Sequence, residues 1–198
     1  MKIQIPEKAN EIIATLAEAG YEAYVVGGCV RDAILGREAA DWDITTNARP
    51  EQVKALFPRT VDTGLQHGTV TVLNGKEGFE VTTYRLDGEY EDCRHPKEVV
   101  FTKSLLEDLK RRDFTINAMA VCLNKARFGE LVDPFGGLDD LKERTIRTPL
   151  DPDITFSDDP LRMMRCVRFA TQLNFYIEDD TFTALERNRD RIKIISRE

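Results

Sequence analysis

Residues 27–43 read GGCVRDAILGREAADWD, and this stretch decides the fold. A short apolar run, YVV, precedes the two glycines and suits a buried strand, while the residues after them carry a helical pattern. Gly36 is a suitable helix end, and Trp42 and Ile44 open a second strand-like segment. The stretch therefore predicts a strand, a helix and a second strand that bring two glycines, an arginine and two aspartates close together.

The segments around this unit predict further helices and strands. Residues 7–19 carry apolar side chains at helical spacing, and Pro50 suits the first position of another helix. Residues 69–73 and 79–85 alternate between apolar and polar side chains around an Asn-Gly turn, which is the pattern of a hairpin. This order predicts an α+β fold in which helices cover one face of a mixed sheet.

The second half of the chain has a mainly helical pattern. We expect short helices at 104–110 and 114–122, then a turn and another short helix within 131–141. Residues 85–101 are charged, show little periodicity and suit a mobile loop. From Asp159 onwards we expect long helices with an apolar face made of Leu161, Met164, Val167, Phe169 and Leu173.

Composition limits the class of protein. The 198 residues suffice for one large domain or one and a half, and the change of pattern suggests a mixed domain at 1–145 and a helical one at 146–198. No apolar stretch reaches the roughly 20 residues of a membrane span. The N-terminus carries charges where a signal peptide would be apolar, so we expect a cytoplasmic location. The net charge of −7 argues against nucleic-acid binding, although basic residues cluster locally at 110–112, 162–168 and 187–193.

Asp41 and Asp43 form the first candidate catalytic site. In a strand, residues two apart point to the same face, so both carboxylates would project together while Trp42 packs on the other side. Two close carboxylates repel each other unless a cation lies between them, and Mg²⁺ suits such a pair. Glu80 would complete a catalytic trio if the strand at 79–85 is the neighbour. The alternatives are a solvated strand edge and an exposed glutamate.

Gly27 and Gly28 add a candidate nucleotide-binding site to the same unit. Glycines between a strand and a helix let backbone N–H groups approach a phosphate, and Arg31 in the following turn supplies the opposite charge. Paired glycines often serve only a turn, so this pattern alone is a weak signal. Further along, Arg112 ends a basic run beside Asp113, a suitable N-cap for the next helix, and is placed to reach a triphosphate.

The stretch SDDPLRMMRCVRFA, at 157–170, suggests a site that reads a nucleobase. Asp159 and Arg162 are three residues apart, and Arg162, Arg165 and Arg168 step along one helix face. An aspartate accepts from an exocyclic amine while an arginine donates to the neighbouring ring nitrogen, so the pair suits cytosine and adenine and rejects uracil and guanine. The alternative is an ordinary salt bridge on a surface helix.

Five motifs in this order resemble those of the class II tRNA nucleotidyltransferases, which are the CCA-adding enzymes and the related bacterial poly(A) polymerases. The motifs are GGCVRDAILGREAADWD, FEVTTYR, EDLKRRDFTINAMA, LVDPFGGLDDL and DDPLRMMRCVRFA. The resemblance implies a nucleotidyltransferase head similar to DNA polymerase β at 1–145 and an all-helical neck at 146–198. The chain ends inside that neck, so we expect the neck to be incomplete and the body and tail of the family to be absent.

The resemblance also implies roles for the candidate residues. Asp41 and Asp43 would hold the catalytic Mg²⁺. The nucleotide contacts would come from Gly28, Arg31 and Arg112, the base would be read by Asp159 and Arg162, and the phosphates would be bound by Arg165 and Arg168. The reaction would be in-line attack by the 3′-hydroxyl of tRNA on the α-phosphate of CTP or ATP, with release of pyrophosphate.

The resemblance leaves alternatives open. The base-reading motif usually opens with Glu, where this chain has the shorter Asp158. Residues 85–101 resemble the flexible loop of enzymes that add all three nucleotides, which favours CCA addition. The alternatives are a poly(A) polymerase that adds AMP to RNA 3′ ends and a non-catalytic nucleotide- or RNA-binding fragment. A metal phosphohydrolase is disfavoured because no histidine cluster accompanies the two aspartates.

Overall fold

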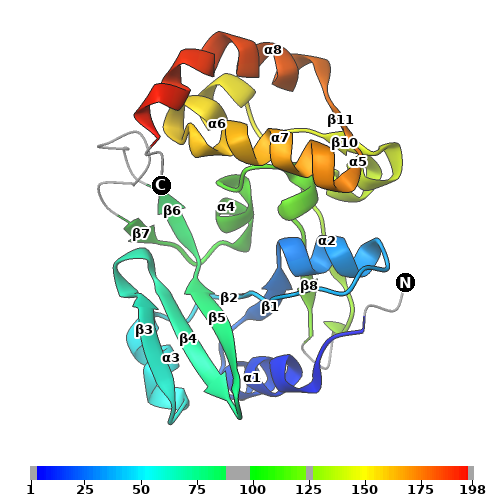
Figure 1. Ribbon diagram of the computed structural model, residues 1–198. Coiled ribbons are helices and arrows are strands. Elements are labelled where there is room, and N and C mark those ends of the chain that lie inside the picture. Colours follow the sequence, from blue (N-terminus) through cyan, green and yellow to red (C-terminus); the bar gives the residue numbers. More distant parts are fainter. Residues whose placement is uncertain (1–3, 88–98, 124–126, 196–198) are drawn as a thin grey trace.

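A computed structural model describes residues 4–87, 99–123 and 127–195. Its centre is a seven-stranded sheet in the order β3-β4-β5-β2-β1-β8-β9 (Figure 1). Among the described strand pairs of this sheet, only β2 and β5 are parallel, so the predicted mixed sheet is confirmed. The strands are β1 (Ala23–Val26), β2 (Ile44–Thr46), β3 (Thr60–Gly64), β4 (Thr69–Asn74), β5 (Glu77–Thr83), β8 (Ala120–Cys122) and β9 (Leu131–Val132).

The predicted helices of the first half of the chain are present. Helix α1 (Glu7–Glu18) contacts β1, and α3 (Pro50–Leu56) begins at the proline and contacts β4 and β5. Helix α2 (Gly28–Ile34) follows β1 directly. The predicted hairpin is the β4–β5 pair. The strand–helix–strand unit around the two glycines is therefore confirmed.

Helices cover both faces of the sheet, so our expectation of one covered face is wrong. Side chains of β1 alternate between two apolar clusters: Val25 joins the main core, whereas Tyr24 and Val26 join a smaller cluster with Leu109 of α4 (Leu105–Lys110). All four residues of β1 are buried. A strand buried on both faces carries a continuous apolar run, which is what the sequence shows at this place.

The helix predicted at 114–122 is wrong. Thr115–Asn117 form a single 3-10 turn, η2, and the chain then enters β8, which pairs with β1. Every residue from 114 to 123 is buried, so apolar side chains occur at nearly all positions of this segment. Some of them fall at helical spacing by coincidence, and this spacing does not indicate a helix with one buried face. Strand β3 was also missed, because most of its residues are exposed at the edge of the sheet and show no apolar alternation.

The C-terminal part is built from α6 (Pro152–Asp158), α7 (Leu161–Leu173) and α8 (Asp179–Asn188), above the sheet in Figure 1. The 3-10 helix η4 (Arg189–Ile194) follows, and α5 (Gly137–Glu143) precedes them. Two short strands, β10 (Thr145–Ile146) and β11 (Tyr176–Ile177), pair in parallel. The described residues from 146 to 195 are therefore mainly helical.

The buried face of α7 differs from the predicted one. Met163 and Cys166, together with Phe169 and Leu173, belong to the main core, whereas Met164 is 50% exposed and Val167 48% exposed. Apolar residues occupy adjacent positions along this helix, so the spacing allows two overlapping stripes. Packing against the rest of the molecule selects one of them, and sequence spacing alone does not.

The stretch predicted as a loop at 85–101 begins and ends as a strand pair. β6 (Arg85–Asp87) and β7 (Val99–Phe101) are antiparallel, whereas residues 88–98, on which the flexible-loop prediction falls, lie outside the described residues. The cysteines at 29, 122 and 166 are free and buried, and Cys93 lies outside the described part. In the described ranges, no helix combines the length and apolar character that a membrane crossing needs.

Candidate active site

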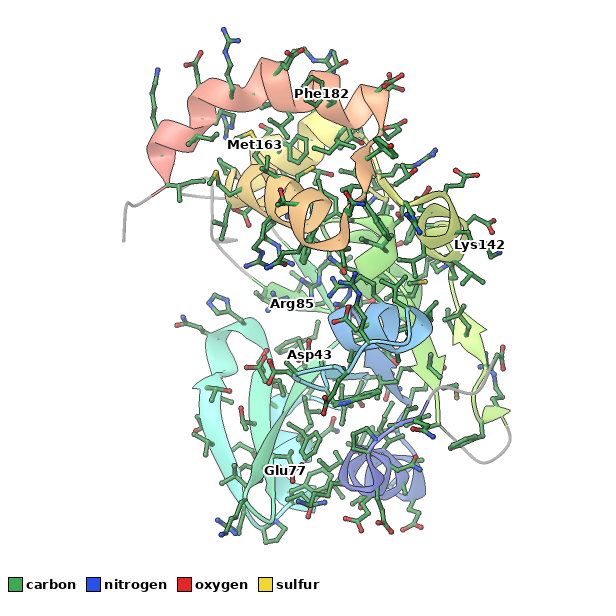
Figure 2. The ribbon with its side chains drawn as sticks, turned by 45° about the vertical axis from the view of Figure 1, so that its right-hand side comes forward. Asp43, Glu77, Arg85, Lys142, Met163 and Phe182 are labelled. Carbon is green, nitrogen blue, oxygen red and sulfur yellow. The ribbon has the colours of Figure 1, made fainter. Side chains whose placement is uncertain are left out.

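One cavity of about 630 Å³ lies where α2, the start of β2 and α7 meet. This volume is in the usual range for small-molecule sites. Figure 2 shows Asp43 and Arg85 of its wall between the sheet and the helical part that carries Met163. Its lining includes the predicted site residues Gly27, Gly28, Arg31, Asp41, Asp43, Arg112, Asp159, Arg162, Arg165 and Arg168. Glu80 is absent from the described lining.

The turn between β1 and α2 requires glycine at position 27. Gly27 has φ +82° and ψ −134°, a backbone conformation essentially confined to glycine. A Cβ atom there would also lie 3.2 Å from Nη1 of Arg112. At Gly28, the nearest atom to an added Cβ would be Nη2 of Arg31 at 3.6 Å, an ordinary contact. Gly27 thus lets the Arg112 guanidinium approach the backbone at the cavity wall.

Arg31 is a buried arginine whose guanidinium is fixed by two partners. Its Nη1 donates a 2.7 Å hydrogen bond to Oδ1 of Asn117, and its Nε donates a 2.8 Å hydrogen bond to Asp32. The residue as a whole is only 8% exposed. Because a guanidinium has five N–H donors, these contacts fix its orientation and leave donors for a ligand in the cavity.

Asp41 and Asp43 lie immediately before β2 and not within a strand, so the predicted strand position is wrong. The segment is nevertheless held against β1, because the backbone N–H of Val26 donates to the Asp43 carbonyl at 3.0 Å. Both aspartates line the cavity, whereas Trp42 lines a different hollow and packs against the main core. The predicted opposite directions of the carboxylates and the tryptophan are therefore confirmed.

The electrostatic setting of Asp43 is unfavourable for a lone carboxylate. Burial raises its pKa, the Glu80 carboxylate raises it further, and so does Asp41, while the Arg112 guanidinium acts in the opposite direction. The pKa of Asp43 stays above its ordinary value. Strand β5, which carries the exposed Glu80, is the parallel neighbour of β2, with Val81 opposite Ile44. The neighbour relationship on which the Glu80 prediction depended is therefore present.

A hard cation fits this donor set. Two carboxylates close enough to raise a pKa are stabilised by a positive charge between them, and Mg²⁺ needs only one or two protein carboxylates because water and phosphate complete its shell. Within the described ranges, no group of three or more His, Cys, Asp or Glu side chains is arranged to hold a metal ion. The fit therefore rests on the Asp41–Asp43 pair.

Asp108 is a residue of this region that sequence reasoning missed. Its fully buried carboxylate accepts hydrogen bonds from Arg111 Nε at 3.1 Å, Arg112 Nη2 at 3.2 Å and Thr45 Oγ1 at 3.2 Å. Burial alone would raise the pKa of Asp108, but the guanidinium groups of Arg112 and Arg111 outweigh it and hold the pKa below its ordinary value. In the sequence, Asp108 precedes Arg111 by three residues and Arg112 by four, and this helical spacing could have indicated the ion pairs.

The proposed base-reading pair does not share a helix. Asp159 lies in extended backbone between α6 and α7, and its Oδ1 accepts from the backbone N–H of Leu161 at 2.9 Å. Arg162 is in the first turn of α7, where its Nη2 donates to the Arg111 carbonyl at 2.9 Å. Both side chains line the cavity. The helix that we expected from Asp159 onwards therefore begins only at Leu161, but the structure brings Asp159 and Arg162 to the same site.

A chain of hydrogen bonds crosses the cavity wall from α2 to α7. The carboxylate of Asp113, which is 7% exposed, accepts from Arg165 Nε at 2.6 Å and from Asn117 Nδ2 at 3.1 Å. Asn117 in turn accepts from Arg31. We expected Asp113 to cap a helix at 114–122, but its side chain instead binds Arg165 directly and Arg31 through Asn117. Asn117 had no sequence signal.

The cavity wall is unusually rich in guanidinium groups. Seven arginine side chains contribute to it, namely Arg31, Arg85, Arg111, Arg112, Arg162, Arg165 and Arg168. Guanidinium groups recognise phosphate and carboxylate oxygens through paired N–H donors. Next to them lies an aspartate pair that fits a hard cation. A mixed sheet that carries an arginine-rich cavity beside a carboxylate pair is typical of the class of proteins that bind phosphorylated ligands.

Comparison with known proteins agrees with this class. The chain belongs to the family described as the poly A polymerase head domain, whose family model matches residues 23–147. The CCA-adding enzyme of Lactobacillus helveticus (strain DPC 4571) is 52% identical over 189 residues, which are 96% of this chain and 46% of that protein. The resemblance inferred from the five motifs is therefore confirmed.

Solved structures show the same fold. The crystal structure of the Bacillus stearothermophilus CCA-adding enzyme in complex with CTP has a TM-score of 0.88 and 44% identity, covering 98% of this chain and 46% of that chain. A tRNA nucleotidyltransferase complexed with a primer tRNA and an incoming ATP analog has a TM-score of 0.75 and 37% identity, with 90% and 50% covered. The chain thus spans about half the length of the curated relatives it matches.

Proposed function

We propose that this chain provides the nucleotidyltransferase centre of a CCA-adding enzyme, which adds CMP and AMP from CTP and ATP to the 3′ end of tRNA. The observation that carries the proposal is a single cavity that collects the Asp41–Asp43 pair, seven arginines and the Asp159–Arg162 pair. The names of the relatives support it, since they are CCA-adding enzymes and include complexes with CTP and with primer tRNA.

The triphosphate would lie against the arginines on both sides of the cavity. Arg31 and Arg112 reach it from the sheet side, beside the glycine turn, and Arg165 and Arg168 reach it from α7. Arg112, Arg31 and Arg165 are each held by a carboxylate or an amide behind them. Donors held in place in this way bind phosphate oxygens without first losing side-chain freedom.

The base would be read by Asp159 and Arg162. The Asp159 carboxylate accepts from the exocyclic amine of cytosine or adenine, and the Arg162 guanidinium donates to the adjacent ring nitrogen. Uracil and guanine present the opposite donor and acceptor at these positions, so they would leave both protein groups unpaired. We propose that this readout works across the junction of a head at 1–145 and a neck at 146–198, because residues of both parts line the cavity.

Asp41 and Asp43, with Glu80 on the neighbouring strand, would form the catalytic carboxylates. The Mg²⁺ that Asp41 and Asp43 would hold would supply Lewis-acid chemistry when bound, lowering the pKa of the attacking hydroxyl. The RNA 3′-hydroxyl attacks the α-phosphate in line, the bond from the α-phosphorus to its bridging oxygen breaks, and pyrophosphate leaves. The arginine side chains orient the triphosphate for this attack and neutralise the charge that develops on pyrophosphate.

A nucleotide-addition assay tests this function. The protein is incubated with tRNA lacking its terminal CCA and with labelled CTP or ATP, and the products are resolved by length. We expect addition of two CMP residues followed by one AMP. Long adenylate tails without CMP incorporation would establish a poly(A) polymerase, and metal-dependent binding of CTP and ATP without any transfer would establish a binding fragment.

A further inference from the structure

Three arginines from two parts of the molecule gather around one aromatic ring. The guanidinium carbons of Arg31, Arg165 and Arg168 lie 5.0, 5.2 and 5.0 Å from the centroid of the Phe169 ring. These distances are within the range of cation–π attraction. Arg31 belongs to α2, whereas the other two belong to α7. One ring therefore contacts guanidinium groups from both walls of the cavity.

The ring is itself held in place. Phe169 is 7% exposed, lines the cavity and packs edge-on against Phe114, with centroids 6.0 Å apart and an interplanar angle of 87°. Phe114 is fully buried. A ring fixed from behind keeps its negatively polarised face at a defined place, and so favours particular positions of the cations around it.

The arrangement answers an electrostatic difficulty of an arginine-rich cavity. Three guanidinium groups near one point repel one another until an anion binds, and two of them are only partly balanced by Asp32 and Asp113. The polarised ring attracts each of them. Arg31 is buried and Arg165 is half-buried, where such attraction is stronger than in water, whereas Arg168 is exposed. The ring therefore keeps the three guanidinium groups close together, as phosphate binding requires. Without the ring, their mutual repulsion would move them apart.

We propose that Phe169 is a positioning residue for the triphosphate: its ring holds Arg31 on one wall and Arg165 and Arg168 on the other where phosphate oxygens bind. The proposal deepens the function proposed above and rests on it, because the triphosphate of CTP or ATP is the ligand. Phe169 acts through the arginines and reads no base, so all nucleotides are affected alike.

Removal of the ring tests this role. In Phe169→Leu, we expect dissociation constants for CTP, ATP and inorganic tripolyphosphate to rise by the same factor, about tenfold, since the attraction to several guanidinium groups is lost. The preference for CTP and ATP over UTP and GTP stays unchanged. Phe169→Tyr keeps the ring and retains the wild-type affinity. Titration calorimetry supplies the constants, and the KM for CTP rises without an equal fall in kcat.

Phe156→Leu is the matched control. Phe156 is fully buried in α6 and does not line the cavity, so its replacement removes the same volume from the core of the helical part. We expect a similar fall in thermal stability with unchanged tripolyphosphate affinity. Phe169→Met, which keeps volume without a ring, repeats the comparison if the leucine variant does not fold.

The inference is overturned if Phe169→Leu binds tripolyphosphate as tightly as the wild type, or if Phe156→Leu loses as much affinity as Phe169→Leu. A wild-type protein that does not bind tripolyphosphate overturns it as well. A wild type that binds CTP and tripolyphosphate but adds no nucleotide defeats the proposed function alone, while a selective loss of tripolyphosphate affinity in Phe169→Leu still supports the positioning role.

Discussion

The buried carboxylate of Asp108 accepts a hydrogen bond from Nη2 of Arg112 at 3.2 Å and so anchors this arginine at the wall of the cavity. On its other side, Arg112 Nη1 lies so close to the backbone of Gly27 that a Cβ atom at this position would be only 3.2 Å away. Its Nε is buried and has no hydrogen-bond partner within the described part of the chain. The guanidinium is thus confined from two sides, which a phosphate-binding group requires.

Replacement of Asp108 should therefore affect both stability and binding. In Asp108→Asn, the partly buried guanidinium groups of Arg111 and Arg112 lose the charge of the buried Asp108 carboxylate. We expect a loss of about 3 kcal/mol in the free energy of unfolding, because removing one member of a buried charge pair is strongly destabilising. CTP affinity should fall as well. Urea unfolding and calorimetry measure the two effects.

Asp139→Asn is the control for this change. Its carboxylate is 76% exposed and pairs only with Lys142 among the interactions of the described residues, so little stability should depend on it. A normal free energy of unfolding in Asp108→Asn would show that the Asp108 charge is not needed to hold the two arginines.

The pKa shifts of Asp108 and Asp43 predict opposite pH dependences. The pKa of Asp108 is lowered in the folded state, so its contribution to stability is complete above its ordinary value of 3.8 and is lost as the pH falls through the lowered value. The difference in unfolding free energy between the wild type and Asp108→Asn should therefore shrink on acidification. Unfolding curves recorded between about pH 6 and pH 2 test this. A constant difference would contradict the lowered pKa.

Asp43→Asn should raise stability while it removes activity. The pKa of Asp43 is raised in the folded state, so ionisation opposes folding: its destabilising effect is absent below 3.8 and complete above the raised value. The uncharged amide of the Asp43→Asn variant does not have this destabilising effect at neutral pH. Asp43 is a proposed ligand of the catalytic cation, so Asp43→Asn should lose several kcal/mol of transition-state stabilisation. We therefore expect kcat for nucleotide transfer to fall about a thousandfold.

The Asp41→Asn variant provides the second arm of that experiment. Because Asp41 is exposed, it should lose transfer activity without a comparable gain in stability. Nucleotide addition and thermal unfolding are measured on both variants. Retained transfer in either one would remove that residue from the proposed metal site.

Local signals predicted the strand–helix–strand unit well, because glycines, apolar runs and a helix end lie within a few consecutive residues. Contacts between distant residues left no such signal. Arg31 meets Asn117 across 86 residues and Arg165 meets Asp113 across 52, so neither partner was visible as such in the sequence. Strand β8 was misjudged for a related reason: its pairing with β1 determines its conformation, and complete burial removes the periodicity that separates a strand from a helix.

Gly27→Ala should disturb the cavity as well as the backbone. The conformation of Gly27 disfavours a side chain by about 1–3 kcal/mol, and the new Cβ would press on the Arg112 guanidinium. We expect weaker CTP binding in addition to lower stability. Gly20→Ala is the control, because Gly20 also has a positive φ, +86°, but nothing within 4 Å of an added Cβ. Equal losses of CTP affinity in both variants would mean that backbone strain alone is responsible.

Arg162→Ala should change base selection more than triphosphate binding. If Arg162 donates to a ring nitrogen, its loss removes a hydrogen bond that cytosine and adenine accept and that uracil and guanine do not, so discrimination should fall about tenfold or more. Arg168→Ala, on the same helix, removes a proposed phosphate contact and should weaken all four nucleotides alike. Competition between CTP and UTP in single-nucleotide addition measures the ratio. An unchanged ratio in Arg162→Ala, with CTP and UTP both weakened, would assign Arg162 to the phosphates and leave Asp159 as the residue that separates an exocyclic amine from a carbonyl.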